Sequence, residues 1–163
     1  MRGRAHHDKI SYYPNERICR DIAGKDGPGT MEPVERDKDG RSGTILLVED
    51  SDVVRAVIAN MLENSGLTVI QASGGKEALA LSRRGDASID LLLTDIVMPE
   101  MGGVELADRL ERERPGMRIL FMTGYAEEVV ANEGILGKHG ECIGKPFTRE
   151  EITKRVRKIL SPE

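Results

Sequence analysis

The chain has 163 residues, of which 39% are hydrophobic and 32% are charged, and its formal net charge is −4. These values are typical of a single globular domain and exclude a protein that binds nucleic acid through a strongly basic surface. Aromatic residues make up only 3%, and no apolar run approaches the length of a membrane span, so we expect neither base stacking nor membrane insertion. The cysteines, Cys19 and Cys142, lie far apart and outside any metal-ligand spacing, which predicts reduced thiols in a cytoplasmic protein.

Residues 1–43 differ in composition from the rest of the chain. They are polar and charged and contain repeated Gly and Pro. Such a segment cannot bury enough apolar surface to offset the entropy lost on ordering. We therefore expect a mostly disordered N-terminal extension followed by one domain at 44–161. Met31 is an alternative to Met1 as the natural start of the chain.

From Thr44 onward, apolar runs alternate with segments of helical periodicity. A continuous apolar run predicts a strand buried on both faces, and apolar residues three or four apart predict a helix. We expect strands at 44–48, 67–71, 89–94, 118–123 and 141–144. Helices are expected between 51 and 66 and at 73–85, 104–114, 126–132 and 148–160. This alternation predicts an α/β fold: a doubly wound, five-stranded parallel sheet of order 2-1-3-4-5, flavodoxin-like, with helices on both faces.

Two of these helices carry clear end signals. Thr148 and Glu151 form the pattern of a capping box, and Phe147 and Ile152 stand at the positions of a hydrophobic staple. Gly66 is expected as the C′ glycine of the first helix. The apolar positions of that first helix are Val54, Val57, Ile58, Met61 and Leu62.

Polar side chains stand at the carboxyl ends of the predicted strands. In chain order they are Glu49 and Asp50, then Asp95, then Thr123, then Lys145. In the predicted order, the first and third strands flank the point where open α/β sheets bind ligands. Three carboxylates, a hydroxyl and an ammonium are therefore expected to converge there.

This set of groups suits phosphoryl chemistry. Carboxylates held close together repel each other unless a cation joins them, and Mg²⁺ prefers carboxylate, carbonyl and water oxygens. One phosphoryl group could share its oxygens with Mg²⁺, Lys145 and Thr123 while Asp95 attacks phosphorus and forms an acyl phosphate. The sequence has no glycine-rich phosphate loop, so it does not predict a nucleotide site.

With these residues in this order, the sequence resembles the receiver domain of two-component response regulators over about residues 43–161. The matching blocks occur in order at 45–50, 93–99, 102–103, 121–126 and 145–147. The resemblance implies that Asp95 accepts phosphate from a phosphohistidine on a histidine kinase or histidine phosphotransfer protein.

The resemblance also implies a role for each residue of the metal site. Asp50 ligates Mg²⁺ directly, Glu49 acts through water, and Asp95 and the backbone carbonyl of Val97 complete the protein ligands. The side chain of Val97, together with that of Tyr125, borders the path of the water that hydrolyses the aspartyl phosphate. Neither side chain can orient that water well, which predicts a long-lived phosphorylated state.

The remaining implied roles concern the response to phosphorylation. Thr123 moves toward the phosphoryl group, Lys145 pairs with it, and the Lys145-Pro146 bond is cis. The family often has Tyr or Phe three residues before the lysine, where this chain has Cys142. The aromatic part of the switch is therefore expected to differ.

The predicted function is a phosphorelay receiver that switches partner interactions and is no enzyme beyond its own phosphorylation and dephosphorylation. Only Ser-Pro-Glu follows Leu160, so we expect no output domain. One alternative is the C-terminal receiver of a hybrid sensor histidine kinase. Another is an aspartyl-phosphate phosphatase, but such an enzyme needs a second acid where Val97 stands. A third is a pseudo-receiver scaffold, against which the acids and the lysine argue.

Deleting residues 1–43 should leave the thermal midpoint of unfolding almost unchanged, because their composition supports no core. The check is a thermal melt of the truncated and full chains side by side. A clear drop for the truncated chain would show that the segment packs on the domain.

Overall fold

The computed structural model describes residues 43–84, 88–124 and 141–161. Within these residues, the strands form one parallel five-stranded sheet in the order β2-β1-β3-β4-β5. The strands are β1 (Thr44–Val48), β2 (Thr68–Ala72), β3 (Leu91–Asp95), β4 (Arg118–Thr123) and β5 (Cys142–Gly144). The predicted fold class and strand order are confirmed.

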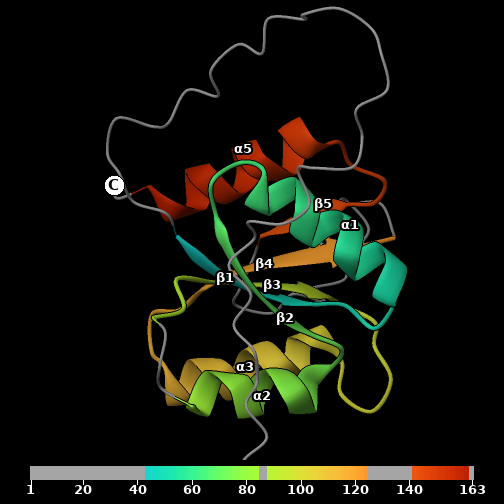
Figure 1. Ribbon diagram of the computed structural model, residues 1–163. Helices are drawn as coiled ribbons and strands as arrows, with labels where there is room; N and C mark the ends of the chain where they lie inside the picture. The colour runs from blue at the N-terminus through green and yellow to red at the C-terminus, as the bar shows by residue number, and fades with distance from the viewer. Residues whose placement is uncertain (1–42, 85–87, 125–140, 162–163) are drawn as a thin grey trace, which may run out of the picture. The chain divides into compact units, whose positions relative to one another are not determined.

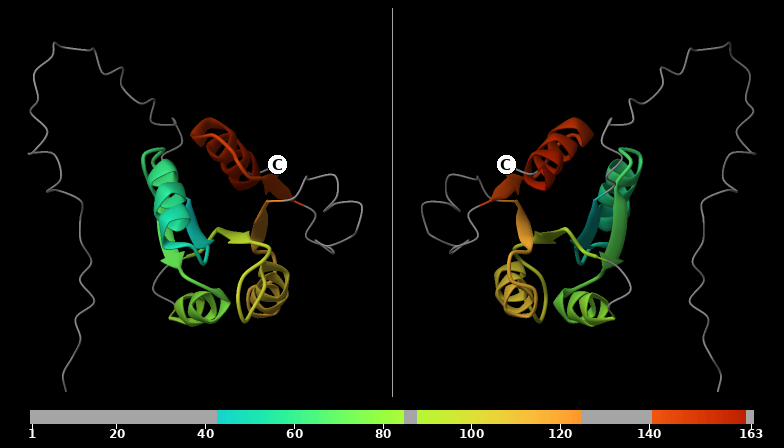
Figure 2. Two further views of the ribbon diagram at one scale, coloured as in Figure 1. Left: turned by 90° about the vertical axis from the view of Figure 1, so that its right-hand side faces the viewer. Right: turned by 90° about the vertical axis from the view of Figure 1, so that its left-hand side faces the viewer.

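The described helices cover both faces of the sheet (Figures 1 and 2). They are α1 (Asp52–Glu63), α2 (Gly75–Arg83), α3 (Gly103–Glu113) and α5 (Arg149–Leu160). Helices α1 and α5 lie on one face, and α2 and α3 lie on the other (Figure 1). The helix expected at 126–132 and the extension expected at 1–43, apart from Gly43, lie outside the described residues. None of the described helices is both long and apolar enough to cross a membrane.

Alternating residues of the central strands build two apolar cores. Leu46, Leu92 and Phe121 face α2 and α3, whereas Leu47 and Leu93 face α1 and α5, and all five side chains are fully buried. Burial of each such side chain stabilises the fold by roughly 1.5–3 kcal/mol. Because β1 is apolar from Ile45 to Val48 and β3 from Leu91 to Leu93, the acidic side chains that follow them fall at the carboxyl edge of the sheet.

The predicted capping box and the C′ glycine are confirmed. The Thr148 hydroxyl accepts the Glu151 N–H at 3.2 Å, and the Glu151 carboxylate accepts the Thr148 N–H at 2.7 Å. Gly66 adopts a φ of 84° and donates its N–H to the carbonyl of Glu63, and the next N–H reaches Leu62. This pair of hydrogen bonds is the Schellman pattern expected at a C′ glycine.

Helix α1 departs from its expected burial. Ile58 and Leu62 are buried, but Val57 is 49% exposed and Val53 is 75% exposed. The apolar stripe of the helix is wider than the surface that the sheet and α5 cover. An apolar surface therefore remains in solvent on α1.

Candidate functional site

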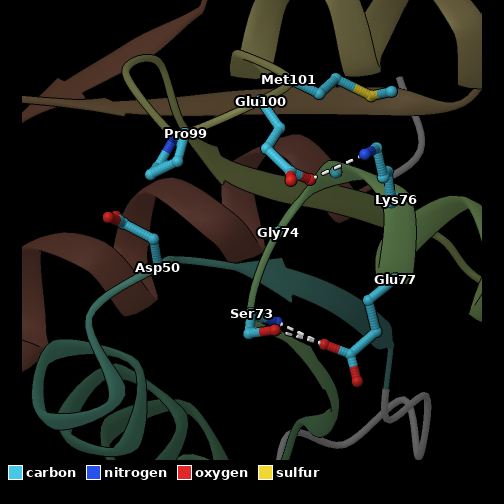
Figure 3. A pocket seen from close by; sticks show the side chains of 9 residues that line it. Asp50, Ser73, Gly74, Lys76, Glu77, Pro99, Glu100 and Met101 are labelled. Atoms are coloured by element: carbon cyan, nitrogen blue, oxygen red, sulfur yellow. Dashed lines mark hydrogen bonds and ion pairs between the residues drawn. The ribbon is translucent and has the colours of Figure 1, made fainter.

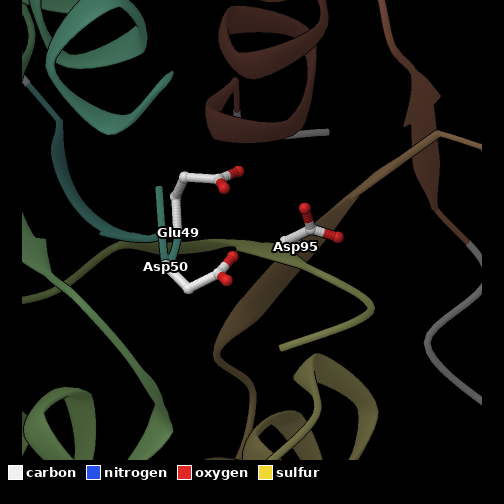
Figure 4. Close-up of side chains that lie close together, drawn as sticks. All are labelled: Glu49, Asp50 and Asp95. Atoms are coloured by element: carbon white, nitrogen blue, oxygen red, sulfur yellow. The ribbon is translucent and has the colours of Figure 1, made fainter. Parts of the chain in front are cut away.

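Three carboxylates meet at the carboxyl edge of the sheet. One oxygen from each of Glu49, Asp50 and Asp95 lies within 4.8 Å of the others, and the side chains face a common space (Figure 4). Glu49 is buried at 3% exposure, Asp95 is half-buried and Asp50 is exposed. Strand register explains the meeting, because Val48 pairs with Thr94 in the parallel ladder and the acids follow directly.

Lys145, which follows the edge strand β5, forms ion pairs with two of these acids. Its Nζ lies 2.6 Å from Asp95 Oδ2 and 2.7 Å from Glu49 Oε2. Burial opposes the charge of the ammonium, but the hydrogen bonds to Asp95 and Glu49 outweigh this effect and raise the pKa of Lys145. The lysine therefore remains protonated throughout the physiological range of pH.

The second oxygen of Asp95 is held by the main chain. Asp95 Oδ1 accepts the N–H of Val97 at 3.1 Å, so both oxygens of this carboxylate have a donor. Val97 itself is 65% exposed. Tyr125, which was expected with Val97 to border the path of the hydrolytic water, lies outside the described residues.

Thr123 and Cys142 lie at the ends of neighbouring strands. Thr123 is the last residue of β4 and is buried, and its carbonyl accepts the Lys145 N–H at 2.6 Å. Cys142 begins β5 and packs in the apolar cluster on the side of α2 and α3. The Lys145-Pro146 bond is cis, as expected. Thr123 and Cys142 thus lie in the strands to which the sequence assigned them.

Gly103, a residue of the matching block at 102–103, packs directly on the backbone of Asp95, the phosphoacceptor candidate. A Cβ added at Gly103 would lie 2.1 Å from the carbonyl oxygen of Asp95. The Gly103 N–H also donates to the carbonyl of Ile96 at 2.9 Å. The first residue of α3 is therefore a backbone support for Asp95, and only glycine permits this approach.

Beside Asp50 lies an open cleft of about 300 Å³, lined by residues 50, 73–77 and 99–101 (Figure 3). An exposed ion pair joins Lys76 to Glu100 at 2.9 Å on its far side. The hydroxyl and N–H of Ser73 both donate to Glu77 and lower the pKa of that carboxyl. The cleft leaves Asp50 accessible from solvent.

The acid cluster fits a small divalent cation. Direct ligands of Mg²⁺ lie about 2.1 Å from the ion, so their oxygens are at most about 4.2 Å apart. One carboxylate oxygen from each of Glu49, Asp50 and Asp95 lies within 4.8 Å of the others. This limit is compatible with direct ligands and with an acid that acts through a water molecule. The oxygens are the hard donors that Mg²⁺ prefers.

Comparison with known proteins identifies similar chains. Residues 45–157 match the family described as the response regulator receiver domain. The chain is 34% identical over 122 residues to the sensor kinase CckA of Brucella abortus (strain 2308), a match that covers 75% of this chain and 13% of the kinase. It is 35% identical over 116 residues to the response regulator receiver protein CpdR of the same organism, covering 71% of this chain and 95% of CpdR.

Solved structures show the same architecture. The receiver domain of the hybrid histidine kinase CckA superposes with a TM-score of 0.62 at 30% identity, covering 73% of this chain and all of that one. The chemotaxis response regulator CheY4 of Vibrio cholerae gives a TM-score of 0.64 at 28% identity, covering 73% of this chain and 99% of that one. The present chain therefore spans whole receiver domains but only a small part of the sensor kinase.

Gly103→Ala should lower the free energy of unfolding by about 1–3 kcal/mol, because the methyl group would overlap rigid backbone of Asp95. Gly74→Ala is the matched control, since Gly74 also stands at the start of a helix but a methyl group there would meet nothing within 4 Å. Urea denaturation of both variants measures the difference. Equal losses would show that contact with Asp95 is not the cause.

Proposed function

The chain belongs to the response regulator receiver domains of two-component systems, and we propose that Asp95 is its phosphoacceptor. The observation that carries the proposal is the position of Asp95 between the Lys145 ammonium and the acid pair Glu49 and Asp50. The donor is a phosphohistidine of a histidine kinase or histidine phosphotransfer protein in the cytoplasm. As a receiver, the chain is a signalling domain, and it catalyses only its own phosphorylation and dephosphorylation.

In the proposed transfer, a carboxylate oxygen of Asp95 attacks phosphorus, the phosphorus–nitrogen bond of the donor breaks and an acyl phosphate forms. Glu49, Asp50, Asp95 and the carbonyl of Val97 would hold Mg²⁺, which when bound supplies positive charge to the phosphoryl oxygens.

Lys145 is already protonated beside Asp95, because its pKa is raised. Its ammonium turns from the carboxylate to the phosphoryl oxygens as negative charge moves there.

The response to phosphorylation involves the ends of β4 and β5. The Thr123 hydroxyl binds a phosphoryl oxygen, and the Thr123 carbonyl already accepts the Lys145 N–H. Movement of either residue is therefore transmitted to the other through this backbone hydrogen bond. Cys142, in the position where related domains often carry an aromatic ring, gives this chain a smaller group in the core. Phosphorylation thereby switches the surface that partner proteins contact.

A protein donor must bring its histidine against Asp95, and α1 offers a surface for that contact. Val53 and Val57 are exposed one turn apart on this helix, which begins directly after the acid pair. The same chemistry applies if the chain is the receiver of a hybrid sensor kinase; the 34% identity to CckA supports this candidate, and the 35% identity to the receiver protein CpdR supports a separate receiver equally. A phosphatase is disfavoured because Val97, two residues after Asp95, cannot transfer a proton.

Incubation with acetyl phosphate and Mg²⁺ should add one phosphoryl group to the wild type and none to Asp95→Asn. The intact mass of the protein measures the product. Asp108→Asn, on α3, is the matched control and should be labelled like the wild type. Equal labelling of Asp95→Asn would disprove the assignment, and labelling that does not depend on Mg²⁺ would disprove the metal requirement.

Val97→Asn should shorten the lifetime of the aspartyl phosphate by several-fold, with little effect on its formation. An amide at this exposed position can orient the attacking water, whereas the valine side chain cannot. The decay is followed by intact mass after removal of the donor. Val57→Asn, at another exposed valine, should decay like the wild type. An unchanged lifetime in Val97→Asn would show that water access past this side chain does not set the rate.

A further inference from the structure

The carboxylate of Asp50 has no side-chain support of its own. It is exposed, and within the described part of the chain it receives no hydrogen bond and forms no ion pair. Glu49 and Asp95, in contrast, are both held by Lys145. The direction of the Asp50 side chain toward the space shared by the three acids must therefore come from the main chain that carries it (Figure 4).

Arg55 holds that segment of the chain through two hydrogen bonds. Its Nη1 donates to the carbonyl oxygen of Glu49 at 2.7 Å, and its Nη2 donates to Asp52 Oδ1 at 2.5 Å. The Arg55 side chain is only 16% exposed. The planar fork of the guanidinium thus closes over residues 49–52, the segment between the end of β1 and the start of α1.

Of the two contacts of Arg55, the hydrogen bond to the carbonyl of Glu49 is the one that can affect the orientation of Asp50. An ion pair from Arg55 to Asp52, three residues earlier, is an ordinary feature of a helix surface and contributes a few tenths of a kcal/mol. The carbonyl of Glu49 lies outside the helix and belongs to the peptide that joins Glu49 to Asp50. A hydrogen bond from a charged donor to this carbonyl restricts the rotation of that peptide.

We propose that Arg55 is a positioning residue for the metal site, because its guanidinium fixes the Glu49–Asp50 peptide and so aims the Asp50 carboxylate at the cation. The proposal rests on the proposed function, in which Asp50 is a direct metal ligand. Arg55 does not touch the cation and acts only through the orientation of Asp50.

Electrostatics and positioning predict opposite effects of removing Arg55. A positive charge near a cation site disfavours binding of the cation, so Arg55→Gln would strengthen binding if charge alone mattered. If Arg55 positions Asp50, the same change weakens binding, because Asp50 samples directions that do not face the ion. The sign of the change in affinity therefore separates the two roles.

The experiment measures binding of Mn²⁺ alone, without any phosphodonor, from the electron paramagnetic resonance signal of unbound Mn²⁺. Arg55→Gln should weaken binding by about 10-fold, the lower range for loss of a residue that supports a metal ligand. Arg55→Lys keeps the charge but lacks the fork, so it should also bind more weakly than the wild type. Arg109→Gln is the matched control, since Arg109 forms a comparable ion pair with Glu105 on α3, and it should bind like the wild type.

Binding to Arg55→Gln that equals or exceeds that of the wild type would overturn the proposal, and so would wild-type affinity in Arg55→Lys. Circular dichroism of each variant confirms that it is folded, and Arg55→Lys keeps the test valid if the Gln variant does not fold. Asp50→Asn separates this inference from the proposed function. If Asp50→Asn binds Mn²⁺ normally, the metal site itself is wrong, whereas a loss in Asp50→Asn without a loss in Arg55→Gln refutes only the role of Arg55.

Discussion

The two ion pairs of Lys145 allow the sheet to hold three acids at one edge. Glu49 is almost completely buried, and a buried carboxylate without a partner costs several kcal/mol. Lys145 supplies that partner and binds Asp95 with the same ammonium. The lysine follows β5, at the opposite end of the sheet order from β2, so the acid cluster is complete only when β1, β3 and β5 are all in register. Correct folding of the whole sheet is thus a condition for the chemistry of the site.

The same pairing makes the site responsive. A lysine that already neutralises Asp95 can follow negative charge from the carboxylate to a phosphoryl group attached to it, and its raised pKa keeps it charged while it does so. The backbone N–H of Lys145 donates to the carbonyl of Thr123, so a shift of the lysine backbone is coupled to the end of β4. Cys142 pairs with Phe121, two register positions before Thr123, and its side chain is small. In the proposed switch, main-chain coupling therefore takes a larger share than rotation of an aromatic ring.

The sequence predicted the meeting of the acids because strand order alone brings the carboxyl ends of β1 and β3 together. It predicted β1 and β4 to the residue and missed the ends of most other described elements by one or two positions. The third strand was expected from Ile89, which is buried, but the ladder begins at Leu91. Burial and ladder hydrogen bonds are separate properties, and an apolar pattern reports only burial. The contacts of Gly103 and Arg55 were not predictable, because each is made to a backbone carbonyl that has no signature in the order of side chains.

These backbone contacts share a physical logic. Gly103 supports Asp95 through its carbonyl, and the N–H of Val97 binds one oxygen of its carboxylate. Arg55 holds Asp50 through the preceding carbonyl and leaves its carboxylate in solvent. A metal ligand held by its own side-chain oxygens would have to break those bonds before it could bind a cation. Asp50, whose carboxylate carries no hydrogen bond among the described residues, is oriented by its main chain and keeps its oxygens available, which in the proposed site lowers the cost of reorganisation when the cation arrives.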